Sequence, residues 1–339
     1  MKIRDLAKLQ ELRAAGLAKL LPTQQARIAV GMGTCGMGTG AEEVYQALAH
    51  ELDRRQLPAL LTQTGCFGCC ALEPLVNIRL PGQPLVMLSK VTRAAVPKLV
   101  AALAKGEIPR DHALCRIETW DHLTAEPLVY GEGFADIPKW NEVPFFKWQK
   151  KIVLRDCGLI NPDDIGEYLA VGGYAALFAA LRGTPEAVLE QVKLSGLRGR
   201  GGAGFPVWRK WDLMKRETAD IKYIICNADE GDPGAYMNRN EIESDPHMLI
   251  EGMILGAFTM GAAEGILYVR AEYPLAVARL KNAVTQAREL GILGPDILGS
   301  GFAFDLHLAV AVLVVVVLLV FMLHLPELIF LLPEVIPLA

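Results

Sequence analysis

The chain has 339 residues and a formal net charge of −4 at pH 7. This length suggests two domains that can each bury a core, and the charge gives no basic surface, so nucleic acid is not an expected partner. The seven cysteines and the charged start, Met1-Lys2-Ile3-Arg4, argue against secretion and a disulfide framework. We therefore expect a cytoplasmic protein with reduced thiols.

Residues 1–105 are predicted to form a small α/β domain. Strands are expected at residues 27–30, 58–61, 75–80 and 84–88, with a helix from about 41 to 57. Thr39 and Glu42 have the spacing of a capping box at the entry of that helix. Residues 106–150 contain four prolines among glycine and aromatic residues, which is typical of an ordered connector with little repeating structure.

Residues 151–306 alternate helical and strand patterns. Asn161-Pro162 and Thr184-Pro185 are each an N-cap residue followed by proline, so helices are predicted to begin there. Strand-like runs at 221–226 and 265–270 flank a helical pattern at 246–261, and another helix is expected at 273–290. Such alternation predicts βαβ units around a parallel sheet, where ligands bind beyond the carboxyl ends of the strands.

A glycine-rich segment from Ser195 reads S-G-L-R-G-R-G-G-A-G-F-P-V-W-R-K-W. Glycines there can turn successive N–H groups inward, and Arg198 or Lys210 can add positive charge, so the loop is suited to a phosphate. A flexible surface loop is the alternative, although Phe205-Pro206 would stiffen it. The arginines interrupt the spacings of both the Walker A loop and the dinucleotide fingerprint.

An acidic segment follows the predicted strand 221–226. It reads C-N-A-D-E-G-D-P-G from Cys226. A solvated acidic turn is the plain interpretation of such a sequence. Its place at the end of a buried-looking strand, in combination with the glycine-rich loop, favours a binding site.

These motifs, together with I-V-L-R-D-C-G-L-I-N-P-D-D-I from Ile152 and D-P-H-M-L-I-E-G-M from Asp245, resemble a known family. It comprises the FMN-bearing, NADH-oxidising subunit of respiratory complex I and the related diaphorase subunits of NAD-linked hydrogenases and formate dehydrogenases. The resemblance implies a Rossmann-like FMN-binding α/β domain. It also implies hydride transfer from NADH to FMN and then release of single electrons to iron–sulfur centres, with no catalytic side chain.

The resemblance also implies roles for particular residues. The glycine-rich loop would hold the FMN phosphate and ring, Asn227, Asp229 and Glu230 would bind the rest of the flavin, and Asp232 would meet the nicotinamide nucleotide. Asp232 stands where the family usually has glutamate. Phe205 would either stack on the adenine or nicotinamide or simply pack beside Pro206. The loop residues concerned are Gly199, Arg200, Gly201, Gly202, Gly204 and Lys210.

The N-terminal cysteines resemble those of the thioredoxin-like [2Fe-2S] ferredoxin domain. Cys66 and Cys70 match its C-x3-C pair and Cys35 matches one earlier ligand, but Val30 stands where the fourth is expected, so that ligand is missing. Three interpretations stay open: a rearranged cluster that uses Cys69, a degenerate domain that docks a partner, or a redox-active C-x-x-C at Cys66 and Cys69. Cys115, Cys157 and Cys226 are expected to be buried apolar side chains.

The resemblance ends near residue 306. The family's second glycine and glutamate motif and its four-cysteine [4Fe-4S] site do not follow, and residues 308–323 are sixteen unbroken apolar residues. We expect residues 307–339 to be a tail foreign to the fold, from a truncated or frame-shifted gene product; a membrane anchor is the alternative. The expected partners are other subunits of an NADH-oxidising iron–sulfur complex, and a noncatalytic binding module is the competing interpretation of function.

Overall fold

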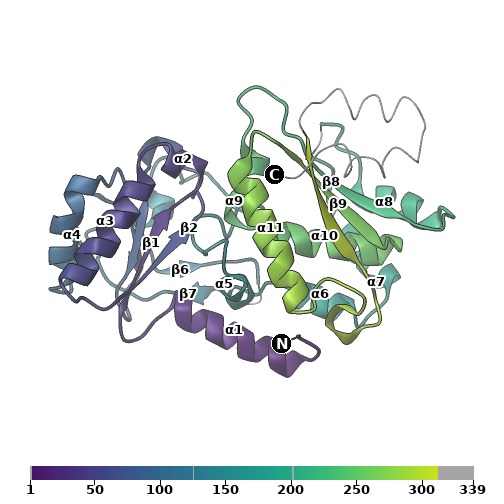
Figure 1. The fold of residues 1–339 in the computed structure, drawn as a ribbon, viewed down its shortest axis with the longest axis horizontal. Coiled ribbons are helices and arrows are strands. Elements are labelled where there is room, and N and C mark those ends of the chain that lie inside the picture. Colours follow the sequence, from purple (N-terminus) through teal and green to yellow (C-terminus); the bar gives the residue numbers. More distant parts are fainter. Residues whose placement is uncertain (1, 125, 201, 312–339) are drawn as a thin grey trace.

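The computed structural model describes residues 2–124, 126–200 and 202–311. Two α/β units lie side by side in it, one built around the sheet that contains β1 and the other around the sheet that contains β8 (Figure 1). The predicted α/β class is confirmed. The apolar tail at 312–339 lies outside the described residues, and so do Gly201 and Ala125.

The first unit is a five-stranded sheet in the order β2-β1-β3-β4-β5. β1 pairs in parallel with β2 and antiparallel with β3, and β4 is antiparallel to both β3 and β5. A βαβ unit followed by two antiparallel strands and a helix is the thioredoxin-like arrangement that the sequence resembles. Its elements are β1 (Ala26–Gly31), α2 (Thr34–Met37), α3 (Ala41–Arg54), β2 (Ala59–Thr64), η1 (Cys70–Leu72), β3 (Val76–Arg79), β4 (Leu85–Leu88), η2 (Arg93–Ala95), α4 (Val96–Leu103) and β5 (Ala113–Ile117).

Helix α3 forms where its amphipathic pattern predicts, with Val44, Leu48 and Leu52 buried against the sheet. The capping box is wrong, because Gly40 is the N-cap residue in a left-handed conformation and no side chain caps the helix. The hydroxyl of Thr39 instead donates to the carbonyls of Cys35 and Gly36 and so closes the short helix α2.

The segment from 106 to 150 has more regular structure than its composition predicts. It supplies β5 to the first sheet, the small ladder β6 (Thr119–Trp120) and β7 (Leu128–Val129), and the turn η3 (Trp140–Glu142). Trp120 and Phe146 from this segment pack on Phe67, with ring centroids 5.7 and 5.2 Å away. The segment therefore covers the face of the first sheet opposite to α3.

The second unit has a parallel sheet in the order β10-β9-β8. The parallel pairing confirms the predicted βαβ units, and β10 continues five residues beyond residue 306. The helix expected at Asn161-Pro162 begins later, because Asp164 caps α5 by accepting from the N–H of Gly166. The elements are α5 (Ile165–Ala170), α6 (Ala175–Ala180), α7 (Pro185–Leu194), α8 (Val207–Arg216), β8 (Tyr223–Ala228), α9 (Met237–Ser244), α10 (Pro246–Met260), β9 (Glu264–Arg270), α11 (Pro274–Glu289), η4 (Ile297–Gly299) and β10 (Asp305–Ala311).

The first helix, α1 (Leu6–Leu20), packs on the second unit rather than on the first. Its residues Leu9 and Leu20 belong to the same buried cluster as the core of the second unit. Gly16 lies so close to α5 that a Cβ atom there would be 1.9 Å from the carbonyl oxygen of Gly166. Within the described residues, no helix is both long and apolar enough to cross a bilayer.

The two units meet in a seam that contains buried charges and close backbone contacts. The guanidinium of Arg27 on β1 lies 2.8 Å from the Glu167 carboxylate on α5, and each side chain is 2% exposed. Gly65, after β2, lies against Ser244 at the end of α9, where a Cβ atom would be 2.0 Å from the Ser244 hydroxyl oxygen. Only glycine fits at this position unless the seam opens.

We expect Gly65→Ala to lower stability by about 1–3 kcal/mol, because the added methyl group forces the two units apart. The matched control is Gly252→Ala on exposed α10 surface, where a Cβ atom would meet nothing within 4 Å. That change should be neutral or stabilise the helix by up to about 1 kcal/mol. Thermal unfolding midpoints of the two variants compare them directly, and equal midpoints would contradict the close approach.

Candidate functional site

The glycine-rich loop forms a narrow hairpin between α7 and α8. The N–H of Gly199 donates to the carbonyl of Phe205 at 2.8 Å, and the N–H of Val207 donates to the carbonyl of Leu197 at 3.0 Å. Gly202 and Gly204 have φ values of +99° and +59°, which L side chains rarely adopt. A Cβ atom at Gly202 would meet no atom within 4 Å, so this part of the loop faces open space.

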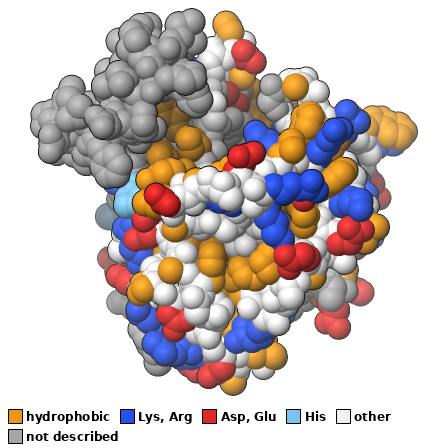
Figure 2. All heavy atoms as spheres, turned by 90° about the vertical axis from the view of Figure 1, so that its right-hand side faces the viewer, with side chains coloured by type: hydrophobic (Ala, Val, Ile, Leu, Met, Phe, Trp, Pro, Cys, Tyr) orange, Lys and Arg blue, Asp and Glu red, His pale blue; other side chains and the backbone are white. Residues whose placement is uncertain are grey.

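The arginines of the loop bind its own backbone. The Nε of Arg198 donates to the carbonyl of Gly204 at 2.6 Å, and Arg200 donates to the carbonyl of Arg198 at 2.6 Å. Phe205 is 43% exposed, and Lys210 is exposed on α8. Figure 2 looks onto the side of the molecule nearest α7 and α8, where hydrophobic side chains are interspersed with Lys and Arg.

The last turn of helix α8 is hydrogen-bonded to the residue that precedes β8. The ammonium of Lys222, just before β8, donates to the carbonyl of Lys215 in the last turn of α8 at 2.9 Å. Unpaired N–H groups of a helix N-terminus favour an anion, so the first turn of α8 is suited to a phosphate. That the glycine-rich loop and the acidic segment share one site stays a prediction.

The acidic segment after β8 is held by its own hydrogen bonds. The side-chain oxygen of Asn227 accepts from the N–H of Asp229 at 3.0 Å, and Asp229 lies 3.8 Å from the guanidinium of Arg270. Asn227 and Asp232 are exposed, whereas Asp229 is half-buried. These three side chains are placed at the end of the strand, as the sequence predicts.

Glu230 is placed differently from its neighbours. Its carboxylate accepts from the N–H groups of Asn238 and Arg239 at 2.9 and 3.1 Å, and thereby caps the first turn of α9. Tyr273 lies 3.4 Å from the same carboxylate, and Arg270 donates to the Glu230 carbonyl. Glu230 thus fixes α9 relative to β8 and β9, a role that its place in the motif did not reveal.

Gly201 lies outside the described residues, so its expected role stays a prediction. Three cavities, with volumes of about 450, 340 and 560 Å³, lie elsewhere in the molecule, and none is lined by the glycine-rich loop or the acidic segment. A cavity shared by the two loops therefore also stays a prediction.

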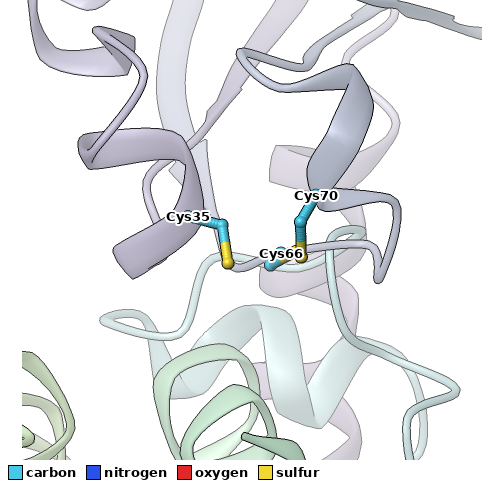
Figure 3. A group of neighbouring side chains, drawn as sticks. All are labelled: Cys35, Cys66 and Cys70. Atoms are coloured by element: carbon cyan, nitrogen blue, oxygen red, sulfur yellow. The ribbon is translucent and has the colours of Figure 1, made fainter. Parts of the chain in front are cut away.

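Three cysteine thiols converge beside the seam between the units (Figure 3). Cys35 comes from α2, Cys66 from the loop after β2, and Cys70 from η1. The three sulfur atoms lie within 4.8 Å of one another, and those of Cys66 and Cys70 are 3.7 Å apart. Two thiolates bound to one tetrahedral metal ion at about 2.3 Å are separated by a similar distance. The constellation expected from the sequence is thus assembled.

Neither residue that the sequence offers for the fourth ligand position joins the three thiols. Val30 is fully buried in the apolar core between β1 and α3, so its side chain faces away from a ligand role. Cys69 is buried in a separate cluster with Phe67 and Cys115, and it is not one of the three converging thiols. Rearranged ligation through Cys69 is therefore not supported.

The surroundings of the thiol site disfavour the ionised forms of Cys35, Cys66 and Glu73 when no metal is bound. Burial and the nearby Cys70 raise the pKa of Cys35 to about 11, and burial raises the pKa of Cys66 further. Burial also raises the pKa of the Glu73 carboxyl to about 7. A positive metal centre would offset these costs, because metal binding deprotonates thiols that are otherwise held neutral.

Arg239 is a residue that the sequence did not single out, and it connects the two candidate sites. Its backbone N–H is bound by Glu230, while its guanidinium lies 3.9 Å from the sulfur of Cys35. On the next turn, Glu243 accepts from the N–H and hydroxyl of Thr34 at 2.8 and 2.5 Å. Helix α9 therefore touches the acidic segment at one end and the thiol site along its length.

Comparison with known proteins finds one family match. Residues 192–316 match the family model described as the Nuo51 FMN-binding domain. This match confirms the resemblance seen in the motifs of that part of the chain. The match covers the glycine-rich loop, the acidic segment and the parallel sheet.

The chain is 52% identical over 162 residues to the NADP-reducing hydrogenase subunit HndC of Solidesulfovibrio fructosivorans, covering 48% of this chain and 33% of that protein. It is 45% identical over 158 residues to an NADH-quinone oxidoreductase subunit of Rhizobium meliloti, covering 46% of this chain and 38% of the relative. The matched part of the chain thus spans between a third and two fifths of these relatives.

Two solved structures are similar at lower identity. An NAD⁺-reducing [NiFe]-hydrogenase in the air-oxidised state has a TM-score of 0.38 at 22% identity, covering 91% of this chain and 49% of that chain. A thioredoxin-like [2Fe-2S] ferredoxin from Aquifex aeolicus has a TM-score of 0.25 at 20% identity, covering 27% of this chain and 92% of the ferredoxin.

The raised pKa of the Glu241 carboxyl on α9 predicts how the stability of the fold depends on pH. Burial raises the pKa of its carboxyl from 4.5 to about 7, so the folded chain holds this proton more tightly than the unfolded chain. The stabilising contribution is complete below about pH 4.5 and is lost as the pH rises to about 7. Glu241→Gln should therefore match the parent near pH 4.5 and exceed its stability by about 2 kcal/mol at pH 8.

Urea unfolding of both proteins at several pH values measures this difference, and Glu289→Gln on the exposed side of α11 is the control. A stability difference between Glu241→Gln and the parent that stays constant from pH 4.5 to pH 8 would contradict the assignment.

Proposed function

We propose that this chain is an electron-input flavoprotein unit that binds FMN and takes hydride from NADH. The observation that carries the proposal is the match of residues 192–316 to an FMN-binding domain, which includes both the glycine-rich loop and the acidic segment. The names of the relatives, a hydrogenase subunit and quinone oxidoreductase subunits, support the oxidoreductase class.

The residues present fit FMN. Gly202 and Gly204 give the loop a backbone conformation that leaves room on its outer side, and the first turn of α8 and Lys210 supply positive potential for a phosphate. Asn227 and Asp229 would bind hydroxyl groups of the ribityl chain, and Asp232 would bind NADH. Bound FMN would accept a hydride and pass electrons on singly, and the protein supplies position and electrostatics.

The thiols of Cys35, Cys66 and Cys70 fit an iron–sulfur centre of the [2Fe-2S] type. Soft thiolate ligands suit such a cluster, and the buried Cys66 with the half-buried Cys35 and Cys70, close to one another, would supply three of its ligands. α9 bridges the two sites, since Glu230 caps its start and Arg239 reaches Cys35. The centre would then be the first acceptor of electrons from the flavin, and further subunits of an iron–sulfur complex would be the onward partners.

Reduction of bound flavin tests the proposed activity. FMN is added to the purified full chain, excess is removed, and NADH is titrated under anaerobic conditions while the visible spectrum is recorded. We expect the flavin absorption to bleach with NADH. Bound flavin that is reduced by dithionite but not by NADH would leave a noncatalytic FMN-binding module and refute NADH oxidation by this chain.

The phosphate role of Lys210 gives a separate prediction. Lys210→Ala should weaken FMN binding by about ten- to a hundredfold, because it removes one charge-assisted contact worth about 1.5–3 kcal/mol. Arg216→Ala is the matched control, since Arg216 lies at the other end of α8, where it pairs with Asp212 at 2.5 Å. Quenching of FMN fluorescence measures both affinities. Equal losses in the two variants would mean that the helix contributes only general positive charge.

A further inference from the structure

The three converging thiols leave the proposed iron–sulfur centre one ligand short. A [2Fe-2S] cluster takes two protein ligands on each iron, four in all. The 3.7 Å separation of the Cys66 and Cys70 sulfurs suits a pair on one iron. Cys35 then needs a companion on the other iron, and the described residues show no fourth thiol within the constellation.

Glu73 is a buried carboxylate beside these thiols. It lies just after η1, three residues beyond Cys70, and is only 6% exposed. Its Oε2 accepts from the N–H of Leu75 at 2.7 Å, whereas its Oε1 is buried without a hydrogen-bond partner among the described residues. An unpartnered buried carboxylate oxygen costs about 1–3 kcal/mol or more, so such an atom calls for a positively charged partner.

The carboxylate of Glu73 also occupies the space that a side chain at position 31 would need. At Gly31, the last residue of β1, a Cβ atom would lie 3.1 Å from Oε2 and 3.5 Å from Oε1 of Glu73. Because side chains alternate along a strand, Gly31 faces opposite to Val30, which is buried in the core. The carboxylate therefore stands where a ligand from the end of β1 would have to project.

No basic side chain is paired with Glu73 within the part of the chain that the structure describes. Arg239 is directed to the Cys35 sulfur at 3.9 Å and to Glu243 at 4.0 Å, and Lys151 donates to the carbonyl of Phe67. The carboxylate lies outside the group of three converging sulfur atoms but close enough that, in addition to burial, its charge raises the pKa of Cys35 and Cys66. Carboxylate oxygen is an established ligand for iron in proteins, alongside thiolate and imidazole.

We propose that Glu73 is the fourth protein ligand of the centre, through its Oε1, with Cys66 and Cys70 on one iron and Cys35 and Glu73 on the other. This inference rests on the proposed iron–sulfur centre and assigns the ligand that the cysteine pattern lacks. The centre would then have mixed sulfur and oxygen ligation rather than four thiolates.

The test is anaerobic reconstitution of the full chain with ferrous iron and sulfide, followed by desalting and analysis of iron, acid-labile sulfide and the visible spectrum. The parent should retain about two irons and two sulfides per chain. Glu73→Ala should retain at least tenfold less, since even loss of a group that supports a ligand costs 10–100-fold in metal affinity. The isosteric Glu73→Gln, which keeps the side-chain volume, should show the same loss while binding FMN as the parent does.

Substitutions that restore iron and sulfide binding distinguish a ligand from a residue that only supports the structure. Glu73→Cys should restore the iron and sulfide content and change the thiolate-to-iron absorption, because one oxygen ligand is replaced by sulfur. Gly31→Cys added to Glu73→Ala should also restore binding, since the small alanine frees the space in front of residue 31. The control is Glu51→Ala, another buried glutamate, which is held by Arg54 and Arg55 at 2.6 Å on α3.

The outcomes distinguish the two proposals. If Glu73→Ala and Glu73→Gln keep the parent's iron, sulfide and spectrum, Glu73 is not a ligand, although the iron–sulfur centre stands. If the parent itself retains no iron and sulfide, or takes up a single zinc ion instead, the iron–sulfur centre fails and the ligand assignment fails with it.

Discussion

The contact between Glu243 and Thr34 is the interaction on which the arrangement of both candidate sites depends. Glu243 is 2% exposed, and its two carboxylate oxygens receive the hydroxyl and the N–H of Thr34 at the start of α2. The next residue is Cys35, so a side chain of the second unit sets the position of a thiol in the first. Arg279 supports this contact by donating to the carbonyls of Glu243 and Met32.

Because α9 carries Glu243, the thiol site and the acidic segment are parts of one rigid connection. Glu230 fixes the first turn of α9, and Ser244 at its end accepts from the N–H of Cys66 at 3.1 Å. Buried hydrogen bonds to charged groups are among the stronger polar contacts in proteins, and losing one partner leaves the other unsatisfied.

Much of the fold could be predicted from the sequence, since its signals are local. The helix at Thr184-Pro185 begins where its cap residue predicts, and Thr184 accepts from the N–H of Ala187. The parallel sheet follows from alternating strand and helix patterns. The capping box at Thr39 and the helix start at Asn161 were wrong, because the Thr39 hydroxyl binds carbonyls of the preceding turn and the neighbouring Asp164 caps the helix instead.

The candidate site was predictable only in part for a related reason. The three converging cysteines have a recognisable spacing, whereas the positions of Glu73 and Arg239 beside them depend on contacts between residues far apart in the chain. Glu73 lies in front of Gly31, and Arg239 reaches Cys35 across 204 positions. No local pattern marks such residues, because an isolated buried glutamate or arginine has the same sequence appearance as an exposed one.

Because α1 packs on α5, the first helix in the sequence belongs structurally to the second unit. The chain starts in the second unit, passes through the whole of the first, and then returns. A single cut at the apparent boundary near residue 150 would therefore leave each fragment with exposed apolar side chains: those of α1 on the first fragment, and those that α1 covers on the second. Functional dissection of this protein calls for internal replacement of residues 22–150 by a short linker, which would preserve α1 in its place.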